Sequence, residues 1–170
     1  KNRADSNHGL DLDAMALKVA NEYSDYKKKQ KAVGNLDYAK LPCVNHPIFK
    51  GKDINYDPRE VFVNDLFKGK GINNVFLDFY HSLVNALFKA KVSKNVYCVN
   101  IDAVIAVILL KIVWADFSEG KLKEEDIESA SFATFLFGRM IGCAAEIDDH
   151  TSRGKNMDTR TPASKCSYVG

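Results

Sequence analysis

The most constraining feature of this sequence is the stretch 96–114, which is apolar almost throughout. Its length is close to the roughly 20 residues that a membrane-spanning helix needs. Asn100, Asp102 and Lys111 interrupt it, and a charge at the centre of a bilayer costs at least about 2.5 kcal/mol. We therefore predict a core helix at 100–114, apolar on all sides, and no membrane span.

Periodic apolar residues predict helices in most of the remaining chain. Residues 13–31 are amphipathic and precede Gly34, whereas 73–91 carry a continuous apolar face. A helix from 57 is predicted because Asp57 and Pro58 are typical of an N-cap and a first helical position. Another begins at 124–126, where acidic residues favour a helix N-terminus. A loop is predicted at 41–56, and the predicted fold class is all-α.

The domain organisation is predicted to be simple. Residues 1–170 read as one catalytic unit that is a piece of a longer protein, with an extended C-terminal arm at 147–170. The arm holds Gly154 and Pro162 and shows no helical period, so we expect a partner chain to order it. An obligate homodimer or higher oligomer is predicted.

Composition excludes several classes of protein. Lys and Arg total 24 against 22 Asp and Glu, so binding to nucleic acid by bulk charge is not expected. The four cysteines (Cys43, Cys98, Cys143 and Cys166) form no CxxC pair, which favours a reducing compartment and argues against zinc or another metal. Cys98 and Cys143 lie in apolar runs, where a thiol behaves as a small hydrophobe.

No signal peptide is visible, and we expect a cytoplasmic protein.

Two histidines are candidate site residues. His8-Gly9 precedes a predicted helix, whose free N–H groups suit an anionic or carbonyl ligand. Taken alone, the pair is better explained by an ordinary turn. His46 lies in the predicted loop between Pro42 and Pro47, where restricted backbone would position a catalytic group. The alternative for His46 is a surface histidine without function.

Two charged residues stand out in apolar surroundings. Asp102 lies at the head of the apolar helix, where Asn100 or Asp102 would serve as the N-cap. A catalytic role for Asp102 is the other interpretation, and the two roles are compatible. Arg139 lies among Phe137, Met140 and Ile141, so we predict a buried guanidinium that needs carboxylate or phosphate partners. The remaining basic residues, Lys94, Arg153, Lys155, Arg160 and Lys165, can be read as solvated surface charges.

These features occur in the order of known motifs. Residues 46–50 (His-Pro-Ile-Phe-Lys) and 57–59 (Asp-Pro-Arg) resemble the Gly-His-x-Val-x-Lys…Asp-Pro-Arg motif of the citrate synthase superfamily, with Asn45 in the place of the glycine. Residues 100–102 (Asn-Ile-Asp) resemble its Asn-Val-Asp, and 136–142 its Leu-Gly-Arg-x-x-Gly helix. The endings Arg160-Thr-Pro and Ser167-Tyr-Val are similar to those of the ATP-citrate lyases. The resemblance extends from His8 to Val169.

The resemblance implies a citrate synthase-like fold, comprising the small domain and the C-terminal helices of the large one, and assigns roles to the candidate residues. His46 would polarise the carbonyl or hydroxyl of oxaloacetate or citrate, with His8 as a further catalytic histidine. Asp102 would be the general base at acetyl-CoA, or the acid in cleavage of citryl-CoA. Arg59, Arg139 and Arg160 would hold carboxylates, Arg160 across a dimer interface, and Lys94 would lie near the phosphates of coenzyme A. A further substrate histidine is expected before residue 1.

Three functions remain open at this stage. The first is the citryl-CoA-cleaving part of an ATP-citrate lyase, which needs an ATP-dependent CoA-ligase module that these residues do not contain. The second is an ordinary citrate synthase, for which the mitochondrial matrix is the expected location. The third is a non-catalytic scaffold subunit that has kept the fold.

Overall fold

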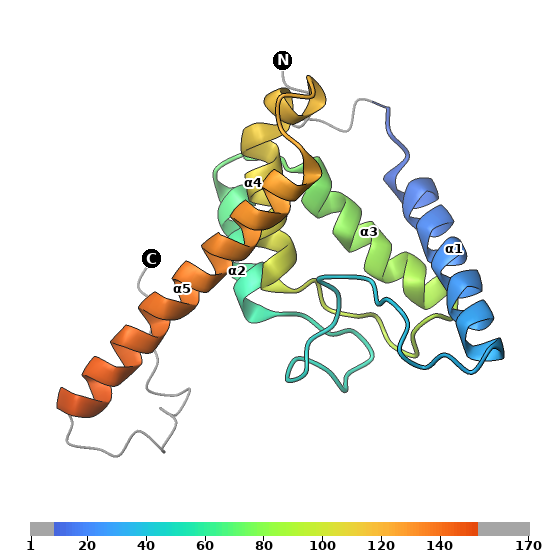
Figure 1. Cartoon of the computed structure of the whole chain (residues 1–170), viewed down its shortest axis with the longest axis horizontal. Coiled ribbons are helices and arrows are strands. Elements are labelled where there is room, and N and C mark those ends of the chain that lie inside the picture. The colour runs from blue at the N-terminus through green and yellow to red at the C-terminus, as the bar shows by residue number, and fades with distance from the viewer. Residues whose placement is uncertain (1–8, 153–170) are drawn as a thin grey trace. The chain divides into compact units, whose positions relative to one another are not determined.

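The computed structural model describes residues 9–152, which form five α-helices and no strand (Figure 1). The helices are α1 (Leu12–Ala32), α2 (Pro58–Gly69), α3 (Val75–Lys89), α4 (Ile101–Ser118) and α5 (Glu124–Ser152). The predicted all-α class is confirmed at this level. The chain divides after Ser131 into two compact units.

The helices begin where the sequence supplies caps. Asp11, Asp57, Asn74 and Asn100 each accept a backbone N–H of the following helix through their side chains. Such caps satisfy donors that would otherwise lack a partner, each typically worth about 1 kcal/mol. The predicted start of α2 at Asp57 and Pro58 is confirmed.

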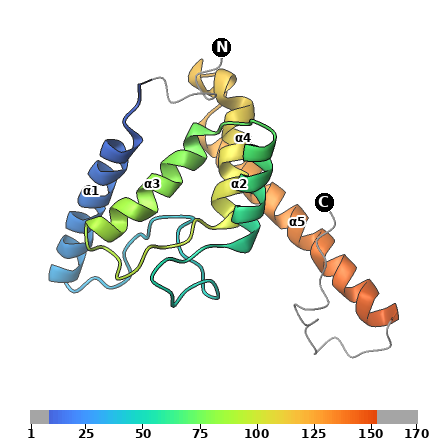
Figure 2. The ribbon, with the colours of Figure 1, turned by 180° about the vertical axis from the view of Figure 1, so that it is seen from behind.

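The core of the first unit has two connected parts. One lies between α3 and α4 and includes Leu77, Val84 and Val104. The other joins α1 to α3 through Ala16 and Leu87, and these two helices lie side by side in both views (Figures 1 and 2). The small Ala side chains of α1 let its backbone approach α3 closely.

Helix α4 is less central than its sequence suggests. Ala103, Val104 and Val107 are buried, but Ile112 is 71% exposed. The prediction of burial on all sides is therefore wrong for this chain, because its other helices cover only part of the circumference of α4.

Helix α5 also corrects the predicted C-terminal boundary. It continues to Ser152, so residues 147–152 are helical and not part of an extended arm. The remainder of the predicted arm lies outside the described residues. Cys143, expected as a small buried hydrophobe, is exposed on α5, whereas Cys98 is buried as expected.

Candidate functional site

Two loops meet at the start of α4 and bring distant motifs together. The backbone of Asn45 donates to the carbonyl of Cys98 (2.8 Å), and that of Asn100 donates to the carbonyl of Cys43 (2.9 Å), around an antiparallel bridge between Val44 and Val99. The Asn100 side chain also donates to the carbonyl of Asn45 (3.4 Å). The His46 loop is thereby fixed beside the first turn of α4.

Asp57 links the same place to the start of α2. Its carboxylate is fully buried and forms two hydrogen bonds with the guanidinium of Arg59 (2.9 and 2.7 Å). It also accepts the backbone N–H groups of Arg59 (3.0 Å) and Ile101 (3.2 Å). Burial alone would raise the pKa of Asp57, but the hydrogen bonds and charge of Arg59 and the Ile101 N–H outweigh it, and the pKa is lowered.

His46, Phe49 and Arg59 form a stack on this loop. The rings of His46 and Phe49 are stacked with centroids 4.6 Å apart, and the guanidinium of Arg59 lies 5.7 Å from the Phe49 centroid. His46 Nδ1 accepts the backbone N–H groups of Ile48 (3.1 Å) and Phe49 (3.4 Å). Since Nδ1 is an acceptor, the ring hydrogen lies on Nε2, which is left as a hydrogen-bond donor.

The loop holds two residues in left-handed backbone conformation. Cys43 has a φ of 62° and Asn45 a φ of 69°, a region that glycine adopts freely and that asparagine tolerates better than most residues. Asn45 thus adopts a backbone conformation that glycine takes without strain. Its side chain accepts the backbone N–H of His46 (2.9 Å), which orients the histidine further.

Asp102 lies near a second polar group formed by Cys43 and Tyr80. One carboxylate oxygen of Asp102 is buried and has no hydrogen-bond partner in the described part of the chain. Burial and the charge of Asp102 raise the pKa of the Cys43 thiol, and a hydrogen bond from Tyr80 opposes this rise. Burial and the contact with Cys43 raise the pKa of Tyr80 to about 12.

We name four residues the α4 site: His46, Arg59, Asn100 and Asp102. They come from the three segments that the sequence motifs had indicated as functional. The Tyr80–Cys43 contact and the role of Asp57 beyond helix capping were not predicted. The apolar surroundings of Tyr80 in the sequence gave no sign of the contact, because it depends on the approach of the loop to α3. The sequence shows Phe49 only as one position of a motif, and its place between His46 and Arg59 follows from the fold.

The other predicted residues have different places. Lys94 is exposed in the connection before α4. Arg139 is exposed on α5, so its predicted burial is wrong; its guanidinium lies 4.8 Å from the centroid of Phe135, one turn away on the same helix. Arg139 belongs to the second unit. His8 and Arg160 lie outside the described residues.

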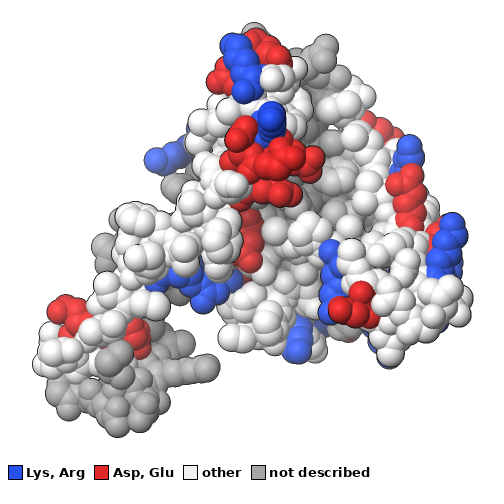
Figure 3. All heavy atoms as spheres, in the orientation of Figure 1, with Lys and Arg blue, Asp and Glu red and all other residues white. Residues whose placement is uncertain are grey.

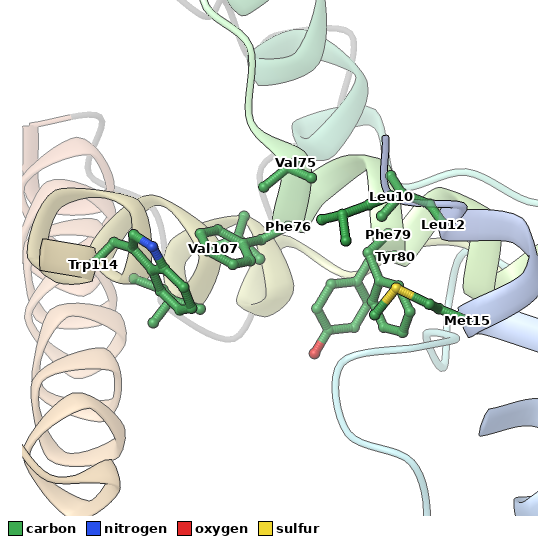
Figure 4. A pocket seen from close by; sticks show the side chains of 10 residues that line it. Leu10, Leu12, Met15, Val75, Phe76, Phe79, Tyr80, Val107 and Trp114 are labelled. Atoms are coloured by element: carbon green, nitrogen blue, oxygen red, sulfur yellow. The ribbon is translucent and has the colours of Figure 1, made fainter. Parts of the chain in front are cut away.

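An apolar groove lies in the first unit. It has a volume of about 960 Å³ and is lined by α1, α3 and α4, with Met15, Phe76, Phe79, Tyr80, Val107 and Trp114 among its walls (Figure 4). Phe76 and Trp114 pack with ring centroids 5.0 Å apart at one end. Tyr80 connects the groove to Cys43, and hence to the vicinity of Asp102.

Within residues 9–152, no three His, Cys, Asp or Glu side chains lie close enough together to hold a metal ion. One described helix, α5, is long and apolar enough to cross a membrane by length and composition alone, which is weak evidence for a span.

Comparisons with models of protein families, with characterised proteins and with solved structures found no match for this chain.

Proposed function

We propose that this chain is the catalytic part of a citrate synthase-like enzyme, which interconverts acetyl-CoA plus oxaloacetate and citrate through citryl-CoA. The reaction of an ATP-citrate lyase, supplied with citryl-CoA by an ATP-dependent CoA-ligase module, is the first form of this proposal. Ordinary citrate synthase chemistry is its second form and uses the same residues. The proposed fold is that of the citrate synthase superfamily, and the proposed active state is a homodimer or higher oligomer.

The proposal depends on one observation: the three sequence motifs converge on the first turn of α4. Asp102 is far from His46 and Arg59 in sequence. The Asn45–Cys98, Asn100–Asn45 and Ile101–Asp57 hydrogen bonds nevertheless hold the three segments together. If these short segments resembled the family motifs only by chance, there would be no reason for them to lie together in the fold.

The available atoms suit this chemistry. His46 Nε2–H can donate to a carbonyl or hydroxyl oxygen, as polarisation of oxaloacetate or citrate requires. The carboxylate of Asp102, which is half-buried, can take a proton from the acetyl-CoA methyl group or, once protonated, return it. His46 is held in its loop by two backbone N–H groups, and Asp102 is held in the first turn of α4, which is the preorganisation that acid–base catalysis needs.

Cationic groups for the substrates are assigned by resemblance. We propose that substrate carboxylates are bound by Arg59, Arg139 and Arg160, because the planar guanidinium is suited to them. Lys94 is proposed to bind the phosphates of coenzyme A. Arg59 already forms an ion pair with Asp57 and keeps 36% of its side chain exposed, so a substrate carboxylate would meet a partly neutralised cation.

That ion pair favours a second candidate function, a non-catalytic subunit of the same fold. A guanidinium that is paired with a buried carboxylate has a sufficient structural role at the junction of α2 and α4. In this case the motifs would persist as packing elements and no substrate would bind.

Calorimetry with coenzyme A and oxaloacetate on the full-length oligomer separates the two functions. If the catalytic proposal holds, both ligands should bind. His46→Asn should then weaken the binding of oxaloacetate at least tenfold. Asparagine at 46 can still accept the Ile48 N–H, so the loop should persist. His81→Asn, which removes a histidine paired with Glu60 (2.8 Å) outside the site, is the control and should leave affinity unchanged. Binding of neither ligand by the wild type would reject the enzyme and favour the scaffold.

A further inference from the structure

Phe49 contacts two functional groups of the α4 site. Its ring is stacked on the imidazole of His46, with centroids 4.6 Å apart and an angle of 26° between the two planes. The guanidinium of Arg59 lies over the same ring, 5.7 Å from its centroid, which is within the reach of a cation–π contact. One aromatic side chain therefore joins the histidine and the arginine for which substrate contacts are proposed.

These contacts form a chain that starts from a buried anchor. Asp57 is fully buried and binds the guanidinium of Arg59 through two hydrogen bonds (2.9 and 2.7 Å). Because Asp57 fixes Arg59, the guanidinium can support the ring of Phe49, and that ring in turn supports the imidazole of His46. Arg59 has its own anchor, so His46 is the group that depends on Phe49.

The imidazole needs this support, because hydrogen bonds from the loop fix only one of its edges. His46 Nδ1 accepts the backbone N–H groups of Ile48 (3.1 Å) and Phe49 (3.4 Å), and the second is longer than a usual N–H···O bond. Rotation of a histidine ring about its last torsion is broad and roughly two-fold, so two bonds to one nitrogen leave the plane some freedom to turn. A ring stacked on the face of the imidazole restricts this rotation and keeps the Nε2–H pointing in one direction.

Core packing does not explain the position of Phe49. Its side chain is only half-buried and belongs to neither part of the core of the described residues. The neighbouring Ile48 is 70% exposed, so the loop is not folded to bury its apolar side chains. The contact with His46 is therefore the feature that distinguishes Phe49 from its neighbour.

Surface charge offers no substitute for such positioning on the face shown in Figure 3. Lysines and arginines lie there in separate groups, and acidic side chains gather at the start of α5. Binding of an anionic substrate then depends on how accurately individual groups are placed, and a misplacement of about 1 Å can cost about 100-fold in rate.

We propose that Phe49 is a positioning residue, which holds the imidazole of His46 so that its Nε2–H meets the carbonyl or hydroxyl oxygen of the substrate. Phe49 acts through His46 and takes no part in proton transfer. The substrate in this inference rests on the function proposed above, whereas the support of the imidazole rests on the contacts of the loop alone.

Hydrogen exchange at single residues of the full-length protein tests the support of the imidazole. The N–H of Ile48 donates to His46 Nδ1 on an exposed loop, so its protection reports whether the imidazole is held. Phe49→Leu keeps an apolar side chain but removes the ring, and the Ile48 amide should exchange at least about tenfold faster because the loop contact opens more often. Phe49→Tyr keeps the ring and should restore slow exchange.

The matched control for this measurement is Phe62→Leu, because Phe62 is 55% exposed on α2. It should leave the exchange of the Ile48 amide unchanged. Protection of the amides of α3 should persist in all three variants and shows that the fold is intact. An Ile48 amide that exchanges equally slowly in Phe49→Leu and in the wild type would overturn the inference.

A double-mutant cycle, measured by calorimetry on the full-length oligomer, tests the route to the substrate. Phe49→Leu should weaken oxaloacetate binding about tenfold in the wild type, but less than about twofold in His46→Asn, where the imidazole is already absent. Equal losses in both backgrounds would show that Phe49 acts by another route and would reject its role as proposed. A wild type that binds no oxaloacetate would reject the proposed function, and the exchange of the Ile48 amide would still decide whether Phe49 positions His46.

Discussion

The carboxylate of Asp57, at the N-terminus of α2, accepts the backbone N–H of Ile101 at the N-terminus of α4 (3.2 Å). One buried side chain thus joins the first turns of two helices. It simultaneously holds Arg59 through two hydrogen bonds. The arrangement places a negative charge where two positive helix ends meet, which stabilises the ionised form.

Replacing Asp57 by asparagine should therefore destabilise the fold. Breaking a buried ion pair typically costs about 3–5 kcal/mol, and the partial exposure of Arg59 lets water hydrate the remaining charge, so the lower end is expected. Chemical denaturation measures this loss. Lys28→Gln, which removes an exposed ion pair with Asp25, is the control and should change stability by less than about 0.5 kcal/mol.

The same contact predicts a pH dependence. The folded-state pKa of Asp57 is lowered, so its stabilisation is present above the unfolded pKa of about 3.9 and is lost as pH falls through the folded value. The free energy of unfolding should fall more steeply below pH 4 in the wild type than in Asp57→Asn. Equal slopes for the two proteins would show that Asp57 contributes nothing to acid sensitivity.

Asn45→Gly should be tolerated, whereas Asn45→Val should not. Glycine adopts a φ of 69° without strain, although the hydrogen bond to the His46 N–H is lost. A β-branched residue in this conformation costs of order 1–3 kcal/mol. Thermal unfolding should therefore rank glycine well above valine, and an inverted order would contradict the left-handed backbone at this position.

The Cys43–Tyr80–Asp102 group predicts opposite shifts in thiol titration. In a background with Cys143 and Cys166 replaced by serine, the pH midpoint for labelling Cys43 should rise in Tyr80→Phe, because a hydrogen bond that lowers the Cys43 pKa is removed. It should fall in Asp102→Asn, because a negative charge that raises that pKa is removed. Cys98 is buried and should remain unlabelled in each folded protein. Shifts in the same direction would reject the arrangement.

Local chemistry made much of this fold predictable from sequence. Helix caps such as Asp57 and the apolar periodicity of residues 73–91 are local signals, because each depends only on residues that are close in sequence. The helices that they predict are present. Burial depends on tertiary packing, which the local sequence around Arg139 or Ile112 does not determine. Both residues were predicted to be buried, and both are exposed. The segments of His46 and Asp102 come together only because two loops pair. In the sequence, only the order of the motifs indicated that these segments would lie together. The groove follows from the spacing of α1, α3 and α4, which no local signal encodes.

The decisive test of the proposed chemistry is Asp102→Asn. Asn100 caps α4 by accepting the Asp102 N–H (3.3 Å), so the helix start does not depend on the Asp102 carboxylate. Asparagine nearly keeps the size of the side chain, and stability should change little. An amide cannot take or return a proton, so turnover should drop by at least about 10²–10⁴.

The assay for this variant uses the full-length oligomer, because the proposed active state is a homodimer or higher oligomer. Coenzyme A and oxaloacetate should still bind to Asp102→Asn, since His46 and Arg59 are unchanged. This pattern of retained binding and lost turnover distinguishes a proton-transfer role from a packing role, in which affinity and stability would fall together. A folded variant with near-normal turnover would leave Asp102 without a part in catalysis, and its unpaired oxygen would then need another explanation.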